Sequence, residues 1–203
     1  MNQLIESYGL GPLAPNTIIC GIHKNDDLEN LASVLTKAQQ KQCNMVILNS
    51  QNDLIDSKMP AGDIHIWWDS SHKKNGEFML ILAYMLNRDS QWKKSKICLK
   101  MIVSCELQRQ QTLLEFKELS RSRRLSLHIE ILVSTHPKED YLKYVSNFSQ
   151  DASLVFLSLE YPREDSTDAY SSYLGSMTSF SKEMPTVVLV QSSESTPLQN
   201  VLI

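Results

Sequence analysis

Four side chains of the kinds that bind metal ions lie close together in the sequence. Asp63, His65, Asp69 and His72 carry carboxylate and imidazole groups, which are common ligands of zinc and related ions. Asp63 and His65 alternate onto one face of an expected strand, but Trp67 continues that face and the spacing fixes no third ligand. A solvated or hydrogen-bonded histidine explains the cluster better, and we expect no metal site.

Gly9-Leu10-Gly11 is a short glycine motif of the kind that can cradle phosphate. Phosphate loops place their glycines after a strand and at the start of a helix, where backbone N–H groups point at the ligand. Here Pro12 and Pro15 follow, the apolar strand comes afterwards, and no Lys-Ser or Lys-Thr pair is present. We therefore expect a structural turn at this motif and no bound cofactor.

Catalytic signatures are missing from the sequence. A Ser-His-Asp set can be drawn from any chain of this size, but no Gly-x-Ser-x-Gly elbow supports a nucleophile. We expect no catalytic residues and a protein that is not an enzyme.

The charge distribution argues against a nucleic-acid partner. The formal net charge is -3, with acidic and basic side chains mixed along the chain. Arg121, Arg123 and Arg124 form the one basic cluster, which suits the solvated C-terminal end of a helix.

Apolar β-branched runs alternate with segments of helix length. The expected strands cover residues 17–23, 45–49, 63–68, 96–104, 127–135, 153–159 and 186–191. The expected helices follow Asp27 as an N-cap, start again at Phe78, and cover 107–124, 141–148 and 168–184, with Pro185 after the last. This order predicts a three-layer α/β fold: a largely parallel, doubly wound sheet with helices on both faces. In the third strand, Trp67 and Trp68 should point to opposite sides.

The chain is long enough for one sizeable core, and we divide it into three parts. Residues 1–16 form an N-terminal connecting segment, 17–191 the α/β domain and 192–203 a flexible, serine-rich tail whose hydroxyls are open to phosphorylation.

The longest apolar run, residues 78–86, is too short for a membrane helix of roughly 20 residues, so we expect a soluble polypeptide with no direct membrane insertion. The cysteines are Cys20, Cys43, Cys98 and Cys105; they form no Cys-x-x-Cys pair, which favours reduced thiols in the cytosol.

Several short motifs occur in a characteristic order. They are Gly9-Leu10-Gly11-Pro12-Leu13-Ala14-Pro15-Asn16-Thr17 with Gly21 in the next strand, Asp63-Ile64-His65-Ile66-Trp67-Trp68-Asp69 with a polar turn at Asn75-Gly76 before an apolar helix, Trp92-Lys93-Lys94-Ser95-Lys96-Ile97, Thr112-Leu113-Leu114 and residues 184–190. In this order they resemble the GLG-x-(L/M)-x-PNT, IDVWW and W-(K/R)-x-(C/x)-K-(I/L) segments, the later helix and the last strand of the cation-chloride cotransporters. The positions that carry the resemblance as structural residues are Gly9, Gly11, Pro15, Asn16, Gly21, Asp63, Trp67, Trp68 and Trp92.

The resemblance implies the cytosolic C-terminal domain of a transporter that moves chloride with sodium or potassium. In that family the domain has a universal-stress-protein-like fold built from two related halves, and it dimerises. This chain would correspond mainly to the second half, with the first strand region at its start. The implied partners are a second copy and the transmembrane transporter domain, at the cytoplasmic face of the membrane. The sequence departs from the family at Ile97-Cys98-Leu99-Lys100, which leaves the transported substrate open.

Two other functions stay open at this point. Some universal stress proteins bind ATP, and Leu174-Gly175-Ser176 resembles part of their site, but residues 159–165 offer no glycine and three acids that would repel a triphosphate. A free-standing universal-stress-like nucleotide-binding protein is one alternative, and the sensor tail of an amino-acid permease is another. We expect a non-catalytic regulatory and dimerisation domain of a cation-chloride cotransporter-like transporter.

Overall fold

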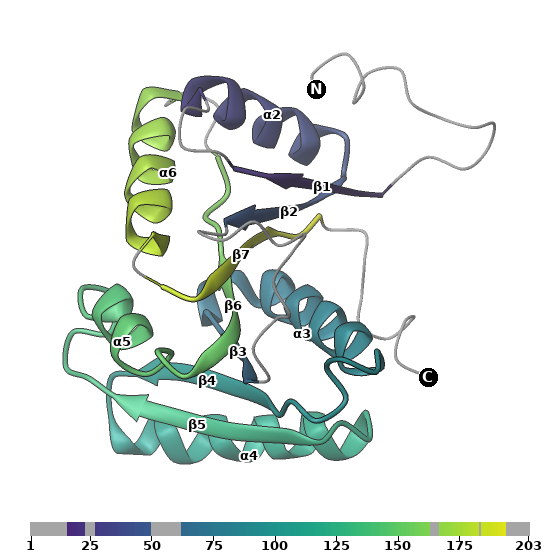
Figure 1. The fold of residues 1–203 in the computed structure, drawn as a ribbon. Coiled ribbons are helices and arrows are strands. Elements are labelled where there is room, and N and C mark those ends of the chain that lie inside the picture. Colours follow the sequence, from purple (N-terminus) through teal and green to yellow (C-terminus); the bar gives the residue numbers. More distant parts are fainter. Residues whose placement is uncertain (1–15, 23–26, 50–61, 163–166, 183, 194–203) are drawn as a thin grey trace.

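The computed structural model describes residues 16–22, 27–49, 62–162, 167–182 and 184–193, which form a single sheet covered by helices (Figure 1). The strands are β1 (Thr17–Gly21), β2 (Asn44–Asn49), β3 (Asp63–Trp67), β4 (Ile97–Val103), β5 (Leu127–Val133), β6 (Ala152–Ser158) and β7 (Thr186–Gln191). The helices are α2 (Leu28–Gln40), the 3-10 helix η1 (Ser70–His72), α3 (Lys73–Asn87), α4 (Glu106–Ser122), α5 (Tyr141–Asn147) and α6 (Thr167–Ser181). Gly9, Gly11 and Pro15 lie outside the described residues.

The sheet is largely parallel, as the sequence predicts, with one antiparallel junction. Its strand order is β1-β2-β7-β6-β3-β4-β5. The five strands from β7 to β5 run parallel to one another, and β1 is parallel to β2. β2 and β7 meet antiparallel, so a two-stranded parallel unit is joined to a five-stranded parallel unit.

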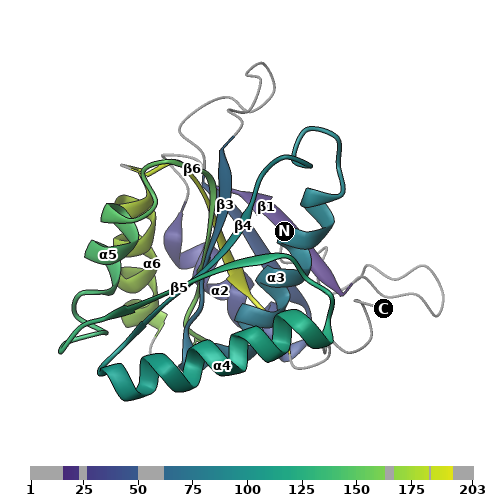
Figure 2. The same ribbon diagram turned by 90° about the horizontal axis from the view of Figure 1, so that it is seen from below.

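Helices cover both faces of the sheet, which gives the expected three layers (Figure 2). One face packs against α3 and α4, and its core includes Trp68, Phe78 and Phe116. The other face packs against α2, α5 and α6, and its core includes Trp67 and Leu174. Neighbouring side chains of a strand point to opposite faces, so the two tryptophans enter different cores, as predicted.

The β1–α2–β2 and β6–α6–β7 units are arranged as approximate two-fold copies. Each is a parallel strand–helix–strand unit, and the pairing of β2 with β7 is symmetric about Ile47 and Leu189. The last residue of β2 contacts α6, and the last residue of β7 contacts α2. Asn49 Nδ2 donates to Thr178 O at 3.3 Å, and Gln191 Nε2 donates to Leu35 O at 3.5 Å. The amino-acid sequences of the two units show no repeat, because the two-fold relation lies in their backbone arrangement.

Helix α3 begins earlier than expected. The sequence prediction placed a polar turn at Asn75-Gly76 and the helix start at Phe78, but α3 begins at Lys73 and both residues are buried within it. Asn75 is satisfied by tertiary hydrogen bonds, and Gly76 makes room for Trp68, so both residues serve packing inside the helix. By contrast, Asp27 caps α2 as predicted. Its carboxylate accepts hydrogen bonds from the backbone N–H groups of Glu29 and Asn30.

The last described residues belong to the folded part of the chain. The sequence prediction started the flexible tail at residue 192, but Ser192 and Ser193 are buried and hydrogen-bonded. Ser193 N donates to Asn44 Oδ1 at 2.6 Å, and Ser192 N donates to Asn75 Oδ1 at 2.7 Å. Their burial makes both serines poor phosphorylation sites. Within the described part of the chain, no helix has the length and apolar character required to cross a bilayer.

Candidate functional site

The described motif residues hold elements together. Asp63 Oδ1 accepts the backbone N–H of Lys96 at 3.0 Å, which ties the start of β3 to the entry of β4. Trp92 is buried in the core on the α3 side, and its carbonyl accepts from Asn87 Nδ2 at 2.9 Å.

The remaining described motif residues lie at the β1 edge and in the two cores. Asn16 O accepts from Asn44 N at 2.7 Å, and Gly21 is the last residue of the partly exposed strand β1. Trp67 and Trp68 are buried in the two cores. The described motif residues therefore take part in packing and in hydrogen bonds between strands.

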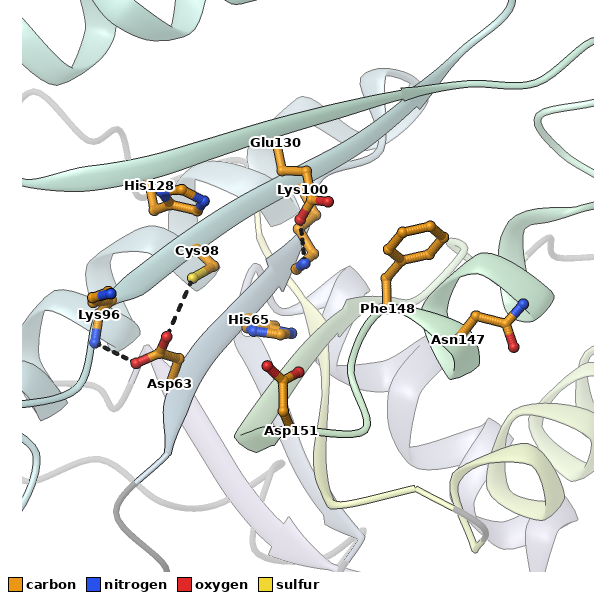
Figure 3. Close-up of a pocket in the computed structure, with 10 residues that line it drawn as sticks. All are labelled: Asp63, His65, Lys96, Cys98, Lys100, His128, Glu130, Asn147, Phe148 and Asp151. Atoms are coloured by element: carbon orange, nitrogen blue, oxygen red, sulfur yellow. Dashed lines mark hydrogen bonds and ion pairs between the residues drawn. The ribbon is translucent and has the colours of Figure 1, made fainter.

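A polar trough lies on the α5 face of the sheet, over the amino-terminal halves of β3, β4 and β5 (Figure 3). Its volume is about 370 Å³. The trough exists because alternate residues of these strands are polar here, and α5, only seven residues long, covers the apolar part of the face. The lining residues are Asp63, His65, Lys96, Cys98, Lys100, His128, Glu130, Asn147, Phe148 and Asp151.

The charges of the trough are largely satisfied within it. Lys100 is buried and forms an ion pair with Glu130, its direct neighbour on β5, while its Nζ lies 6.0 Å from the centre of the Phe148 ring. Burial, with Asp63 nearby, raises the pKa of the Cys98 thiol to about 11, so this thiol stays protonated at neutral pH. The trough therefore offers neither a free buried charge nor a reactive thiolate.

A buried serine links His65 to Trp67. Ser149 Oγ accepts from Trp67 Nε1 at 2.9 Å and lies 3.1 Å from His65 Nδ1. Burial, followed by the positive charge of Lys100, lowers the pKa of His65 to about 4. His65 is thus a neutral, hydrogen-bonded core histidine, and the fully buried Ser149 cannot reach a substrate.

The four metal-type residues of the sequence do not converge. Asp63 and His65 face the trough, whereas Asp69 and His72 lie beyond the other end of β3. Asp69 accepts from Ser71 N at 2.8 Å and pairs with His72 Nδ1 at 2.8 Å. Over the described residues, no group of three or more His, Cys, Asp or Glu is placed to hold a metal ion.

A second and larger hollow, of about 680 Å³, lies at the carboxyl ends of the parallel strands. We call it the crevice. It is lined by the segments that follow β3 and β6, by Tyr141 of α5 and by Tyr173 of α6. The chain leaves β3 toward β4 on one side, while β6 flanks β3 on the other, so the crevice lies where the winding direction of the sheet changes. Open α/β sheets bind ligands at this position.

Two carboxylates and several aromatic rings define the crevice. Asp69 follows β3 and Glu160 follows β6. Tyr161 lies 5.4 Å from His72, centre to centre. Among the described residues, the Tyr141 hydroxyl is the one buried side-chain oxygen or nitrogen without a hydrogen-bond partner. Its position and volume make the crevice the candidate functional site.

Among its described lining residues, the crevice lacks the phosphate-binding features of a nucleotide site. Gly175 of the Leu174-Gly175-Ser176 motif lies in the middle of α6, where its nearest neighbour is Leu28 Cδ1 of α2. It is therefore not at a helix N-terminus, where backbone N–H groups bind phosphate. Glu160 and the ring of Tyr161 stand where the chain leaves β6.

Sequence reasoning considered Asp69 and the acids after β6, but missed the tyrosines of the crevice. Tyr141, Tyr161 and Tyr173 come from three different segments, and no spacing links them. Their common signal is position, because residues 69 and 160–161 directly follow two strands. The basic cluster of Arg121, Arg123 and Arg124 lies at the C-terminal end of α4, where Arg121 is exposed and pairs with Glu118 at 3.8 Å.

No protein-family model matches the chain, and a comparison with curated proteins finds no relative. Solved structures do show the fold. The cytoplasmic domain of a prokaryotic cation chloride cotransporter aligns with a TM-score of 0.69 at 17% identity, over 98% of this chain and 70% of that chain. A universal stress protein from Archaeoglobus fulgidus DSM 4304 aligns with a TM-score of 0.53 at 12% identity, over 89% of this chain and 62% of that one. The chain thus has a universal-stress-like α/β fold similar to a transporter's cytoplasmic domain.

Proposed function

We propose that this chain is a non-catalytic regulatory and dimerisation domain of a cation-chloride cotransporter-like membrane transporter, at the cytoplasmic face of the membrane. The fold likeness to the cytoplasmic domain of a prokaryotic cation chloride cotransporter carries the proposal. That alignment spans 98% of this chain, so it includes the β1–α2–β2 unit as well as the five parallel strands.

The sheet arrangement gives a second line of support. The sequence resemblance implies a domain of two related halves, with this chain corresponding mainly to the second half and the first strand region at its start. The symmetric pairing of β2 with β7 is the junction that two such halves would make. The motif order from Asn16 to Trp92 supports the same family, since its residues join β1 to β2 and β3 to β4.

A domain of this kind acts through surfaces. It would bias the conformations of the transporter by contacting the membrane part, or its own second copy, differently in each state. Exposed apolar side chains suited to such contacts are Ile19 on β1 and the pair Leu107 and Leu114, seven residues apart on α4. No chemistry is required for this role.

Transport measurements test the proposal. The membrane part from the same gene or operon is expressed with and without this chain, and chloride-dependent uptake of a rubidium tracer is followed in cells. We expect the chain to co-purify with the membrane part in detergent and its removal to change the uptake rate. Unchanged uptake combined with no co-purification would contradict the proposal. Amino-acid uptake that depends on the chain would favour the permease alternative.

A free-standing nucleotide-binding protein is the main rival from another class. Because the crevice carries Asp69 and Glu160 and no glycine loop, we expect millimolar ATP to leave the melting temperature unchanged. A ligand at a hundred times its dissociation constant would add about 2.7 kcal/mol, which is easily measured. A clear upward shift would favour the rival. Steady ATP or ester turnover that a single substitution abolishes would contradict the non-catalytic role.

A further inference from the structure

The neutral ring of His65 carries its proton on Nε2. The Ser149 hydroxyl accepts from Trp67 Nε1 at 2.9 Å, and the acceptor for its own hydrogen is His65 Nδ1, 3.1 Å away. Ser149 Oγ makes no other hydrogen bond in the described part of the chain. Because Nδ1 accepts this hydrogen bond, the N–H group of the imidazole is the one at Nε2.

This N–H group opens into the trough. His65 is only 3% exposed, and it lines the trough. Among the described residues, every fully enclosed side-chain nitrogen or oxygen has a hydrogen-bond partner except the Tyr141 hydroxyl. His65 Nε2 has no such partner, so it is not enclosed and is reached from the trough. A donor held in a largely buried ring in this way has room for an acceptor from a ligand.

Acidic and basic groups lie at opposite ends of the trough. Asp63 begins β3 and Asp151 directly precedes β6, the neighbouring strand, so both acids lie at one end. Lys100 is aligned with Trp67, the last residue of β3, and lies at the other end. Side chains on one face of a strand repeat about every 6.6 Å, which puts His65 between the two ends. Figure 3 shows the Asp151 carboxylate and the Lys100 amino group pointing toward the His65 ring from opposite sides.

The end groups have hydrogen-bonding capacity left for a ligand. The exposed Asp151 carboxylate makes no hydrogen bond or ion pair with the described residues. Lys100 has three N–H groups, and its ion pair with Glu130 uses one of them. The pKa of His65 is lowered most by burial, then by Lys100, and is raised by Asp151 and Asp63, so these charges lie close to the ring.

We propose that the trough binds a free α-amino acid. The carboxylate of the ligand accepts from Lys100 and His65 Nε2, and its ammonium group donates to Asp63 and Asp151. The side chain of the ligand lies toward the Phe148 ring. A zwitterion adds no net charge, which suits a trough whose buried lysine already has a carboxylate partner. The site would make the domain a sensor of an amino acid, which goes beyond the proposed transporter role and does not depend on it.

Calorimetric titration of the whole chain with L-leucine and two analogues tests the site. We expect L-leucine to bind at millimolar concentration. The analogues 4-methylpentanoate, which lacks the amine, and 3-methylbutylamine, which lacks the carboxylate, should bind more weakly by about tenfold or more. The first would bring a carboxylate to two acids, and the second would leave His65 Nε2 without an acceptor. Absence of L-leucine binding, or equal binding of either analogue, would overturn the proposal.

Two variants locate the binding. Asp151→Asn and His65→Asn should each weaken L-leucine binding by about tenfold, since each removes a charge-assisted contact. Asp151 is exposed, so its substitution does not endanger the fold, and asparagine at position 65 retains an acceptor for Ser149 but lacks the Nε2 donor. The matched controls Asp168→Asn and His136→Asn, both exposed and outside the trough, should leave the affinity unchanged. Equal weakening in variants and controls would show non-specific binding and overturn the proposal.

Nitrogen NMR of the histidine rings gives a readout that a purely structural role of His65 would not change. The free protein should show His65 protonated at Nε2, and L-leucine should shift this Nε2 resonance but not that of His136. Protonation at Nδ1, or an Nε2 resonance that stays unchanged at saturating L-leucine, would refute the assignment of His65 as a ligand-binding residue and overturn the proposal.

Discussion

Trp68 packs against the backbone of Gly76 so closely that a Cβ atom on Gly76 would lie 2.5 Å from Trp68 Cδ2. Trp68 follows β3 directly and Gly76 lies in the first half of α3, so the contact sets how this helix lies on the sheet. The indole also packs against Phe116 of α4, whose ring centre is 5.3 Å from that of Trp68. The next residue, Asp69, enters the crevice, so this packing also positions a carboxylate of the candidate site.

Gly76→Ala should destabilise the protein by about 1–3 kcal/mol, because the indole or the helix must move to admit a methyl group. Urea unfolding followed by tryptophan fluorescence measures the change. Gly175→Ala is the matched control in α6, since its new Cβ would meet only Leu28 Cδ1 at 3.4 Å, the end of a flexible side chain. That variant should be neutral or more stable by up to about 1 kcal/mol, through helix propensity. Equal losses in both variants would contradict the packing argument.

The Asn75 carboxamide joins four groups in the core. Its Nδ2 donates to Ser158 Oγ at 2.7 Å and to Leu159 O at 2.8 Å, and its Oδ1 accepts from Ser192 N at 2.7 Å and from the Tyr161 hydroxyl at 3.1 Å. These bonds connect α3 to the ends of β6 and β7, at the base of the crevice.

Asn75→Ala should therefore cost about 3 kcal/mol of stability, because it removes four buried hydrogen bonds and leaves the buried Ser192 N–H without its Asn75 partner. Chemical denaturation provides the measurement. Asn147→Ala, at the exposed end of α5, is the control and should change stability by less than about 0.5 kcal/mol. If Asn75→Ala were as stable as the control, the hydrogen bonds of Asn75 would not contribute to the stability of the fold.

The neutral His65 makes stability depend on pH in a defined window. In the unfolded chain the imidazole takes up a proton near pH 6.5, while burial holds the pKa of the folded state at about 4. The unfolded state therefore binds more protons between these values, and stability falls as the pH drops from 6.5 to 4. The contribution is fully present above pH 6.5 and amounts to about 3 kcal/mol at most.

His65→Asn should flatten this part of the stability–pH curve relative to the unsubstituted protein. Urea unfolding at several pH values measures the slopes. His128→Asn, an exposed residue of the same trough, is the control and should keep the original slope. An NMR titration in which the His65 ring protonates near pH 6.5 in the folded protein would refute the prediction.

Local sequence patterns were sufficient to predict most of the fold. Runs such as 186–191, rich in valine, became strands because β-branched side chains fit a sheet buried on both faces. The boundaries failed at Asn75-Gly76, where a sequence typical of a turn continues a helix because tertiary partners use the amide and the missing side chain. The antiparallel meeting of β2 and β7 was also missed, since strand direction across a long connection leaves no local pattern.

The site was less accessible from sequence than the fold. Asp69 was found because its type suggests ligand chemistry, but it was grouped with Asp63, which lies at the opposite end of the same strand. Tyr141 and Tyr173 become a site only once α5 and α6 fold over the same end of the sheet. Similarly, the Lys100–Glu130 ion pair depends on the register between β4 and β5, which a single amino-acid sequence does not reveal.

Self-association is the remaining prediction of the proposed function. No strand among the described residues pairs with the outer edge of β1, and Ile19 on that strand is 72% exposed. An apolar strand edge is a template for pairing, and a two-fold dimer would join the same edge from each copy. We therefore expect sedimentation equilibrium at micromolar concentration to give the mass of a homodimer. Ile19→Lys should shift the equilibrium toward monomer, whereas Met85→Lys, at a similarly exposed apolar residue of α3, should not. A monomer mass at every concentration would exclude the dimer, and a loss of association in Met85→Lys alone would place the interface on α3.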